Sequence, residues 1–150
     1  MLTSLIETKG NLSALLLRLG LAVVFFPHGV QKVLGWFSGL GFSKTIEVFT
    51  TKLHFPLALV LLLMAIEFLG SISLIVGFLT RIWAFGIGAA MTVCALMNHI
   101  QHGFFMNWFG QQKGEGIEFH ILVVAMAVAL IILGGGSLSV DALLIKRRKI

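Results

Sequence analysis

Four long apolar stretches, separated by short polar segments, dominate this chain. They cover residues 12–34, 57–79, 82–99 and 117–133. A helix needs about 20 residues to cross the hydrocarbon layer of a membrane, and each stretch comes close to that length. We therefore predict an all-α fold in which four membrane-spanning helices form one bundle, a single domain over residues 1–150.

The loops between the spans carry two further patterns. Between the first two spans, Ser43 can cap a short amphipathic helix at the membrane interface. The apolar face of this helix would carry Phe42, Ile46, Phe49 and Leu53. Before the fourth span, aromatic residues among polar ones are typical of an interfacial anchor, with a lid over an outer cavity as the alternative. These residues are Phe104, Phe105, Trp108 and Phe109.

Composition narrows the class of protein. With 58% hydrophobic and 11% charged residues, the chain has too little polar surface for a soluble globule, so we predict an integral membrane protein. The net charge is +5, but the basic residues are not gathered on one face, which argues against nucleic acid as a partner. The basic tail, residues 146–149, suits anionic membrane lipids. Because Cys94 is the one cysteine, a disulfide or a Cys-x-x-Cys pair within the chain is excluded.

The distribution of basic residues predicts the orientation. An even number of spans places both termini on one side of the membrane. The basic tail and Arg81 would lie on that side, whereas the opposite loops carry only Lys44, Lys52 and Lys113. Since basic residues concentrate on the cytoplasmic side, both termini are predicted to be cytoplasmic.

Ionisable residues interrupt the first span on a single face. At about 100° per residue, Lys32 lies about 40° from Arg18 and His28 about 80° from it. Phe25 shares that arc. Ionisable groups at membrane depth are costly and turn toward protein or a wet cavity, so this face is a candidate functional site.

Depth along the spans, at about 1.5 Å per residue, predicts that polar side chains meet at two levels. Glu67 lies near the midplane, where Arg18 is long enough to form an ion pair with it. That pair would serve either a function or helix packing alone. A second group of polar side chains shares a depth nearer the outer surface. So many ionisable groups at one depth favour a role in binding or proton handling over simple hydration. The members of this outer level are His28, Lys32, Asn98, His99, Glu118 and His120.

Metal and haem are less favoured cofactors for this outer level. Two histidines could hold haem iron, and histidine with glutamate could hold zinc or non-haem iron. His99 and His102 are three residues apart, but no Glu-x-x-His or His-x-x-x-His element recurs on a second helix. We therefore predict no metal site.

Several short motifs, taken in order, make the chain resemble the DoxX family over nearly its whole length. They are Arg18 to Lys32 with Pro27-His28-Gly29 inside, Glu67-x-x-Gly70, residues 77–81, His102-Gly103-Phe104-Phe105, residues 114–119 and residues 136–141. The resemblance implies a small four-helix protein of the bacterial inner membrane that serves as an oxidoreductase subunit. The family's polar positions would be Arg18, His28, Lys32, Glu67, Arg81 and Glu118. The chain has no tyrosine, so it lacks the one that many members carry before the fourth span.

The leading hypothesis is a redox-associated membrane subunit that binds a quinone-like or other flat apolar molecule among the helices. A quinone head needs hydrogen-bond donors and a proton donor, and its tail needs an apolar groove. The candidates for catalysis are His28, His99 and Glu118, with Glu118 orienting an imidazole and Lys32 as electrostatic support. The predicted ligand-binding set is Arg18, Phe25, His28, Lys32, Glu67, Asn98, His99, Glu118 and His120. Because no residue here carries electrons alone, we expect a redox enzyme as partner.

Two alternatives stay open. One is a non-catalytic membrane scaffold or assembly factor, in which the charges only fix helix packing. The other is a small transporter or proton pathway through Glu67. Small residues at steps of four on the third span, Ala84, Gly88 and Thr92, suit either a contact within the chain or a homo-oligomer.

Overall fold

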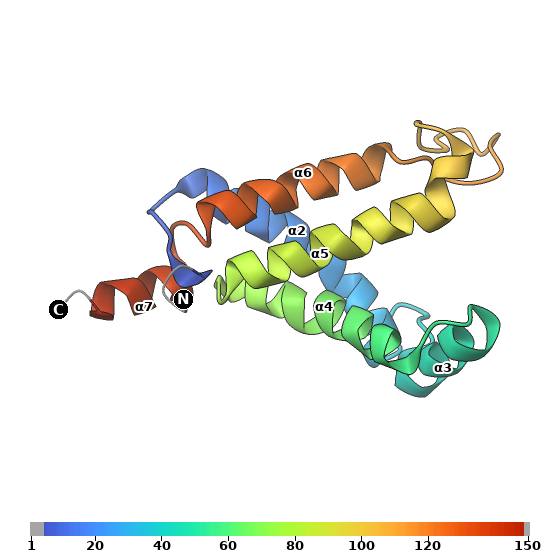
Figure 1. The fold of residues 1–150 in the computed structure, drawn as a ribbon, viewed down its shortest axis with the longest axis horizontal. Coiled ribbons are helices and arrows are strands. Elements are labelled where there is room, and N and C mark those ends of the chain that lie inside the picture. Colours follow the sequence, from blue (N-terminus) through green and yellow to red (C-terminus); the bar gives the residue numbers. More distant parts are fainter. Residues whose placement is uncertain (1–4, 149–150) are drawn as a thin grey trace.

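The structure, a computed structural model, describes residues 5–148, and all the regular elements in that range are helical (Figure 1). Lys149, which belongs to the basic tail, lies outside the described residues. The α-helices are α2 (Leu12–Val33), α3 (Gly41–Glu47), α4 (Leu57–Val76), α5 (Thr80–Cys94), α6 (Glu118–Leu133) and α7 (Val140–Arg148). Short helical turns follow α3 and α5: the π-helical η1 (Val48–Lys52) and η2 (Ala95–His99), and the 3-10 turn η3 (Ile100–His102). The predicted all-α class is confirmed.

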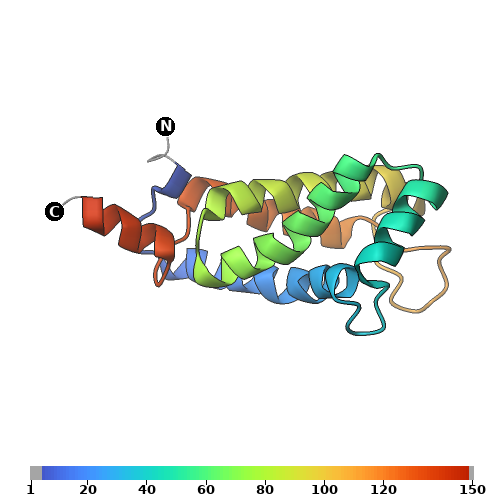
Figure 2. The same cartoon turned by 90° about the horizontal axis from the view of Figure 1, so that it is seen from below.

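The four longer helices, α2, α4, α5 and α6, run side by side (Figures 1 and 2). Helix α2 packs mainly against α4, and α5 packs against both α4 and α6. At one end of the bundle lie α3 and the loop between α5 and α6, and at the other end lies α7. Thr8, near the start of the described chain, donates a hydrogen bond to the Leu133 carbonyl at 3.3 Å, so the segment before α2 lies against the end of α6.

Three helices are long and apolar enough to cross a membrane: Leu12–Val33, Leu57–Val76 and Thr80–His102. Helix α6 is apolar but has 16 residues, which makes it shorter than these three. Large apolar side chains such as Val23, Phe85 and Ile132 are 71%, 66% and 69% exposed. Water would penalise such a surface, whereas lipid tails accept it. The predicted membrane character is therefore confirmed at the level of these helices.

Helix α3 occupies the predicted place between the first two spans, but its start differs from the prediction. It begins at Gly41 after Leu40, and Ser43 lies inside it rather than at its N-cap. The Thr45 side chain is buried and donates a hydrogen bond to the Lys32 carbonyl at 3.2 Å. This bond holds α3 against the end of α2.

Arg18 joins three parts of the chain at the α7 end of the bundle. Its side chain is 1% exposed, and its five N–H groups donate to five backbone carbonyls. The acceptors are Leu74 and Ile75 on α4, and Gly135, Ser137 and Leu138 after α6. Carbonyls in the last turn of a helix lack partners within the helix and carry partial negative charge, so a guanidinium suits them. The predicted ion pair between Arg18 and Glu67 is wrong.

A second polar contact, which the sequence analysis did not include, lies beside Arg18. The buried Asp141 carboxylate, at the start of α7, accepts hydrogen bonds from the backbone N–H groups of Leu79 at 2.8 Å and Thr80 at 3.0 Å. It therefore caps α5 from a distant part of the chain. Gly77 makes this contact possible, because a Cβ there would lie 2.4 Å from that of Ser139 and its φ is +70°.

Candidate functional site

Lys32 on α2 and Glu67 on α4 form a salt bridge inside the bundle. The Lys32 Nζ lies 2.6 Å from the Glu67 Oε2, and the two side chains are 20% and 12% exposed. One turn before Lys32, a Cβ on Gly29 would lie 2.6 Å from the Phe68 backbone, so the two helices are in close contact here. The partner of Glu67 is thus Lys32. Arg18 and Lys32, which were predicted on one polar face of α2, make separate contacts: Arg18 with backbone carbonyls and Lys32 with Glu67.

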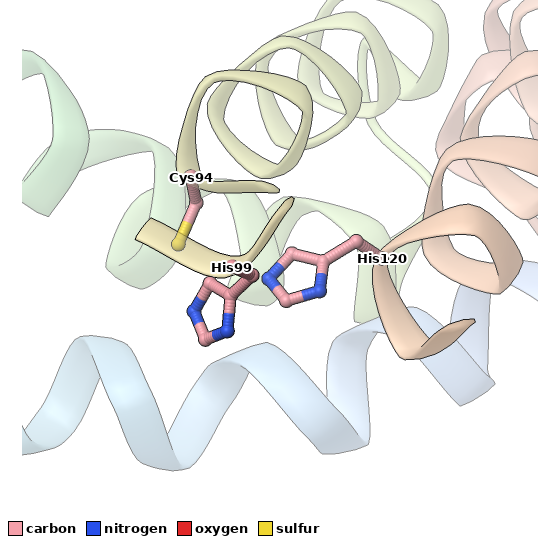
Figure 3. A group of neighbouring side chains, drawn as sticks. All are labelled: Cys94, His99 and His120. Carbon is pink, nitrogen blue, oxygen red and sulfur yellow. The ribbon is translucent and has the colours of Figure 1, made fainter. Parts of the chain in front are cut away.

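The main cluster of potential ligand atoms joins Cys94, His99 and His120. One ligand atom from each of these residues lies within 4.8 Å of the others (Figure 3). The two imidazole rings have centroids 4.3 Å apart and planes inclined by 44°. His120 is buried, whereas Cys94 and His99 are partly buried. Figure 3 shows the Cys94 side chain on the same side of the bundle as the two rings, which come from η2 and α6.

The π-helical turn η2 explains why Cys94 and His99 lie together. In a regular α-helix, residues five apart point about 140° away from each other. In a π-helical turn the hydrogen bonds join residues five apart, which stacks these residues on one face. Because η2 spans Ala95–His99, it directs His99 back over Cys94.

The two histidines differ in their hydrogen bonds. His99 Nδ1 lies 2.9 Å from the Glu115 carbonyl oxygen, which can only accept, so Nδ1 carries the proton and Nε2 keeps its lone pair. The Nδ1 of His120 is buried and has no hydrogen-bond partner among the described residues. The backbone of Gly116 also faces this ring without meeting hydrogen-bond geometry. A buried, unpaired imidazole nitrogen is costly and marks a place where a partner would be gained.

Glu118 does not orient an imidazole, contrary to the prediction. Its Oε1 accepts hydrogen bonds from the Met106 backbone N–H at 3.0 Å and from the Trp108 indole N–H at 3.1 Å. The Glu118 backbone N–H in turn donates to the Phe104 carbonyl at 2.9 Å. Glu118 therefore holds the loop between α5 and α6 against the start of α6.

An apolar groove of about 410 Å³ opens beside this loop. It is lined by Phe104, Met106, Trp108, Glu118, Phe119, Ile121 and Leu122. Phe119 also contacts the His120 ring edge to face, with centroids 5.9 Å apart. The groove therefore adjoins the cluster of Cys94, His99 and His120 through one aromatic side chain.

The remaining residues of the predicted site lie in other surroundings. His28 is exposed, and its ring lies 6.3 Å from that of Phe25, which belongs to the buried core. Asn98 is exposed, and its amide donates a weak hydrogen bond to the Cys94 carbonyl at 3.5 Å. Arg18 has no N–H left for a ligand. Of the predicted outer level, the structure brings His99 and His120 into ring contact.

Sequence analysis missed Cys94 as a site residue and missed the aromatic groove as a binding surface. Cys94 was set aside because it is the one cysteine and lies in an apolar run. The signal was present in the combination of a thiol with His99 five residues later, but it acquires meaning only through a π-helical turn. The sequence predicted the aromatic residues of the groove as an interfacial anchor. Their concave arrangement depends on the hydrogen bonds of Glu118 to Met106 and Trp108, which no local sequence pattern indicates.

Comparison with family models matches residues 13–100 to the model described as DoxX. The match extends from α2 to η3 and includes Arg18, Lys32, Glu67, Cys94 and His99. Comparisons with curated proteins and with solved structures gave no match.

Proposed function

Because this chain belongs to the DoxX family of membrane proteins, we propose that it is the membrane subunit of a redox system and binds a quinone-like, flat apolar molecule. The observation that carries the proposal is the aromatic groove of about 410 Å³ beside Glu118. Sites for small molecules are concave and mostly apolar, with volumes of about 300–1,000 Å³ and a few placed polar groups. The groove matches the volume and the apolar lining of such sites, and Glu118 supplies one polar group.

Different groove residues would contact different parts of a bound quinone. Phe104, Trp108 and Phe119 offer ring faces and edges for a flat ring. Ile121 and Leu122, on the first turns of α6, continue the groove toward the lipid-facing surface, where an isoprenoid tail would follow. Glu118 is the ionisable group in the lining, and hydrogen bonds from described residues reach its Oε1 only, which leaves Oε2 available to a ligand or a proton.

Reduction of a quinone consumes two electrons and two protons. In this proposal the electrons come from a protein partner with its own redox cofactor, Glu118 passes one proton to one quinone oxygen, and water at the membrane surface supplies the second proton to the other oxygen. A proton pathway through Glu67 has less support, because the Glu67 Oε2 contacts the Lys32 ammonium. His28 and His99 have weaker claims as proton donors, because His28 is exposed and His99 uses its N–H on Glu115.

Fluorescence quenching in lipid nanodiscs tests the groove. Quinones quench tryptophan, so a variant that keeps only Trp108 (W36F/W83F) should show saturable quenching by a short-chain quinone. The matched control keeps only Trp36 (W83F/W108F), a second exposed tryptophan, which lies in the loop before α3. We expect the control to show only the linear, unsaturable quenching of a quinone dissolved in lipid. If both variants quench linearly and equally, the groove binds no quinone and the scaffold alternative is favoured.

The proposal includes a topology with α6 as the fourth span, both chain ends in the cytoplasm, and a bacterial inner membrane. Helix α6 rises only about 24 Å over its 16 residues, so neighbouring residues or a thinned bilayer must complete the crossing. Its packing against α5 supports this assignment. The concentration of Lys146 and Arg147 on α7 supports a cytoplasmic end.

A reporter that is active only in the periplasm checks this topology. Fused after Ile150 it should give no activity, and inserted after Gly110, in the loop before α6, it should give strong activity. Activity from the C-terminal fusion alone would contradict the orientation, and activity at both positions would contradict the fourth crossing. Inactivity at both positions, with both fusions present in the membrane, would contradict the fourth crossing.

A further inference from the structure

We propose that Cys94, His99 and His120 form a binding site for a copper(I) ion. The three potential ligand atoms already lie within 4.8 Å of one another, and they come from two different helical segments. At metal–ligand distances of about 2.0–2.3 Å, three ligands around one ion lie about 3.5–3.9 Å apart. The side chains therefore need to close by only about 1 Å to hold an ion.

The surroundings of each histidine support a ligand role. The Glu115 carbonyl accepts the Nδ1–H of His99 at 2.9 Å, which leaves the Nε2 lone pair free to bind a metal. Metal-binding histidines commonly have this arrangement, in which a backbone carbonyl orients the ring and fixes its tautomer. His120 is 5% exposed, and Figure 3 shows one of its ring nitrogens turned toward the side chains of His99 and Cys94.

Ring packing alone does not account for the cluster. Two neutral imidazoles can stack, and this would explain the 4.3 Å between the centroids. It does not explain why the Cys94 thiol also lies within 4.8 Å of a nitrogen of each ring. The π-helical turn that brings Cys94 and His99 together is also a rare structure, which occurs frequently at functional sites.

The donor set selects the metal. Thiolate and imidazole are soft or borderline ligands, and one cysteine with two histidines in a trigonal arrangement is typical of copper sites. Zinc would need a fourth ligand, such as water, in addition to the three that this cluster supplies, whereas copper(I) is satisfied by three. Magnesium and calcium require oxygen ligands, and no carboxylate among the described residues belongs to the cluster.

The site lies beside the proposed quinone groove but uses other residues. Phe119 lines the groove and contacts the His120 ring, so an ion at the cluster would lie close to a bound flat molecule. Copper binding does not require the groove to bind a quinone. The two proposals can therefore fail separately.

Copper(I) binding is measured on the full-length protein in detergent, under anaerobic and reducing conditions, by competition with a chromophoric copper(I) chelator. We expect one copper per chain, and we expect C94S and H120Q each to weaken binding about 100-fold or more, because each removes a ligand. H54Q, which changes an exposed histidine two residues before Pro56, should bind like the unchanged protein. Oxidation of the loaded protein should produce a visible sulfur-to-copper absorption band that C94S lacks.

Three outcomes would overturn the proposal. One is copper(I) binding that C94S leaves unchanged, a second is copper(I) binding that H120Q leaves unchanged, and a third is a failure to bind copper(I), with or without stoichiometric binding of zinc. Thermal unfolding of the metal-free variants checks that the fold is intact, and C94S is close in shape to the original residue. Quenching of Trp108 by quinone should be unchanged in C94S, which separates a failure of this site from a failure of the groove.

Discussion

Arg18→Ala should lower the stability of the protein more than any other single replacement of a charged residue. It removes a guanidinium whose five N–H groups all donate to backbone carbonyls. Each buried acceptor left unpaired costs about 1–3 kcal/mol. We therefore expect a loss of at least about 3 kcal/mol, seen as a large fall in unfolding temperature in detergent or as loss of the folded peak in size-exclusion chromatography.

Two variants make this result specific. Arg18→Lys keeps the charge but has three donors for the five carbonyls, so its unfolding temperature should be intermediate. Lys44→Ala removes an exposed basic residue on α3 and should have almost no effect. An Arg18→Ala protein that unfolds at the same temperature as the original would show that the hydrogen bonds of Arg18 contribute nothing net to stability.

Gly29→Ala should produce the second large effect, with a sign opposite to that of helix propensity. Replacing glycine by alanine inside a helix normally stabilises it by up to about 1 kcal/mol. At Gly29, however, the new Cβ would lie 2.6 Å from the Phe68 backbone and 2.7 Å from the Glu67 carbonyl carbon. Backbone cannot move aside as a flexible side chain can, so α2 and α4 must separate, and we expect a net loss of about 1–3 kcal/mol.

Gly20→Ala is the matched control on the same helix. A Cβ at Gly20 would meet only the terminal methyl of Met126 at 3.2 Å, which can rotate away. Gly20→Ala should therefore leave the unfolding temperature unchanged or slightly raised. Equal unfolding temperatures for the two variants would contradict the close contact between α2 and α4.

The long helices could be predicted from the sequence because their cause is local. The length of an apolar run can be read directly from neighbouring residues. The ends of α2 and α4 were therefore predicted to within about three residues. The depth of a residue, estimated from its distance along its own span, predicted side-chain contacts between spans less well. It placed Arg18 closer to Glu67 than Lys32, although Lys32 makes that contact.

The candidate site was less predictable because its parts depend on several segments at once. Arg18 finds acceptors in the loop after α6, and no pattern around Arg18 indicates that this loop folds back. Cys94 and His99 face each other only because the helix widens into a π turn, whereas regular helical spacing keeps them apart. The contact between His99 and His120, by contrast, follows the predicted common depth of the two residues.

The acceptors of Arg18 also constrain the order of events during biosynthesis. The first long helix reaches the membrane-insertion machinery while the carbonyls of Gly135, Ser137 and Leu138 are still unmade. A lone guanidinium is costly in hydrocarbon, so it must wait in water or among lipid headgroups. The nascent chain thus completes this junction only after translation has passed Leu138, and the segment after α6 closes the bundle around α2.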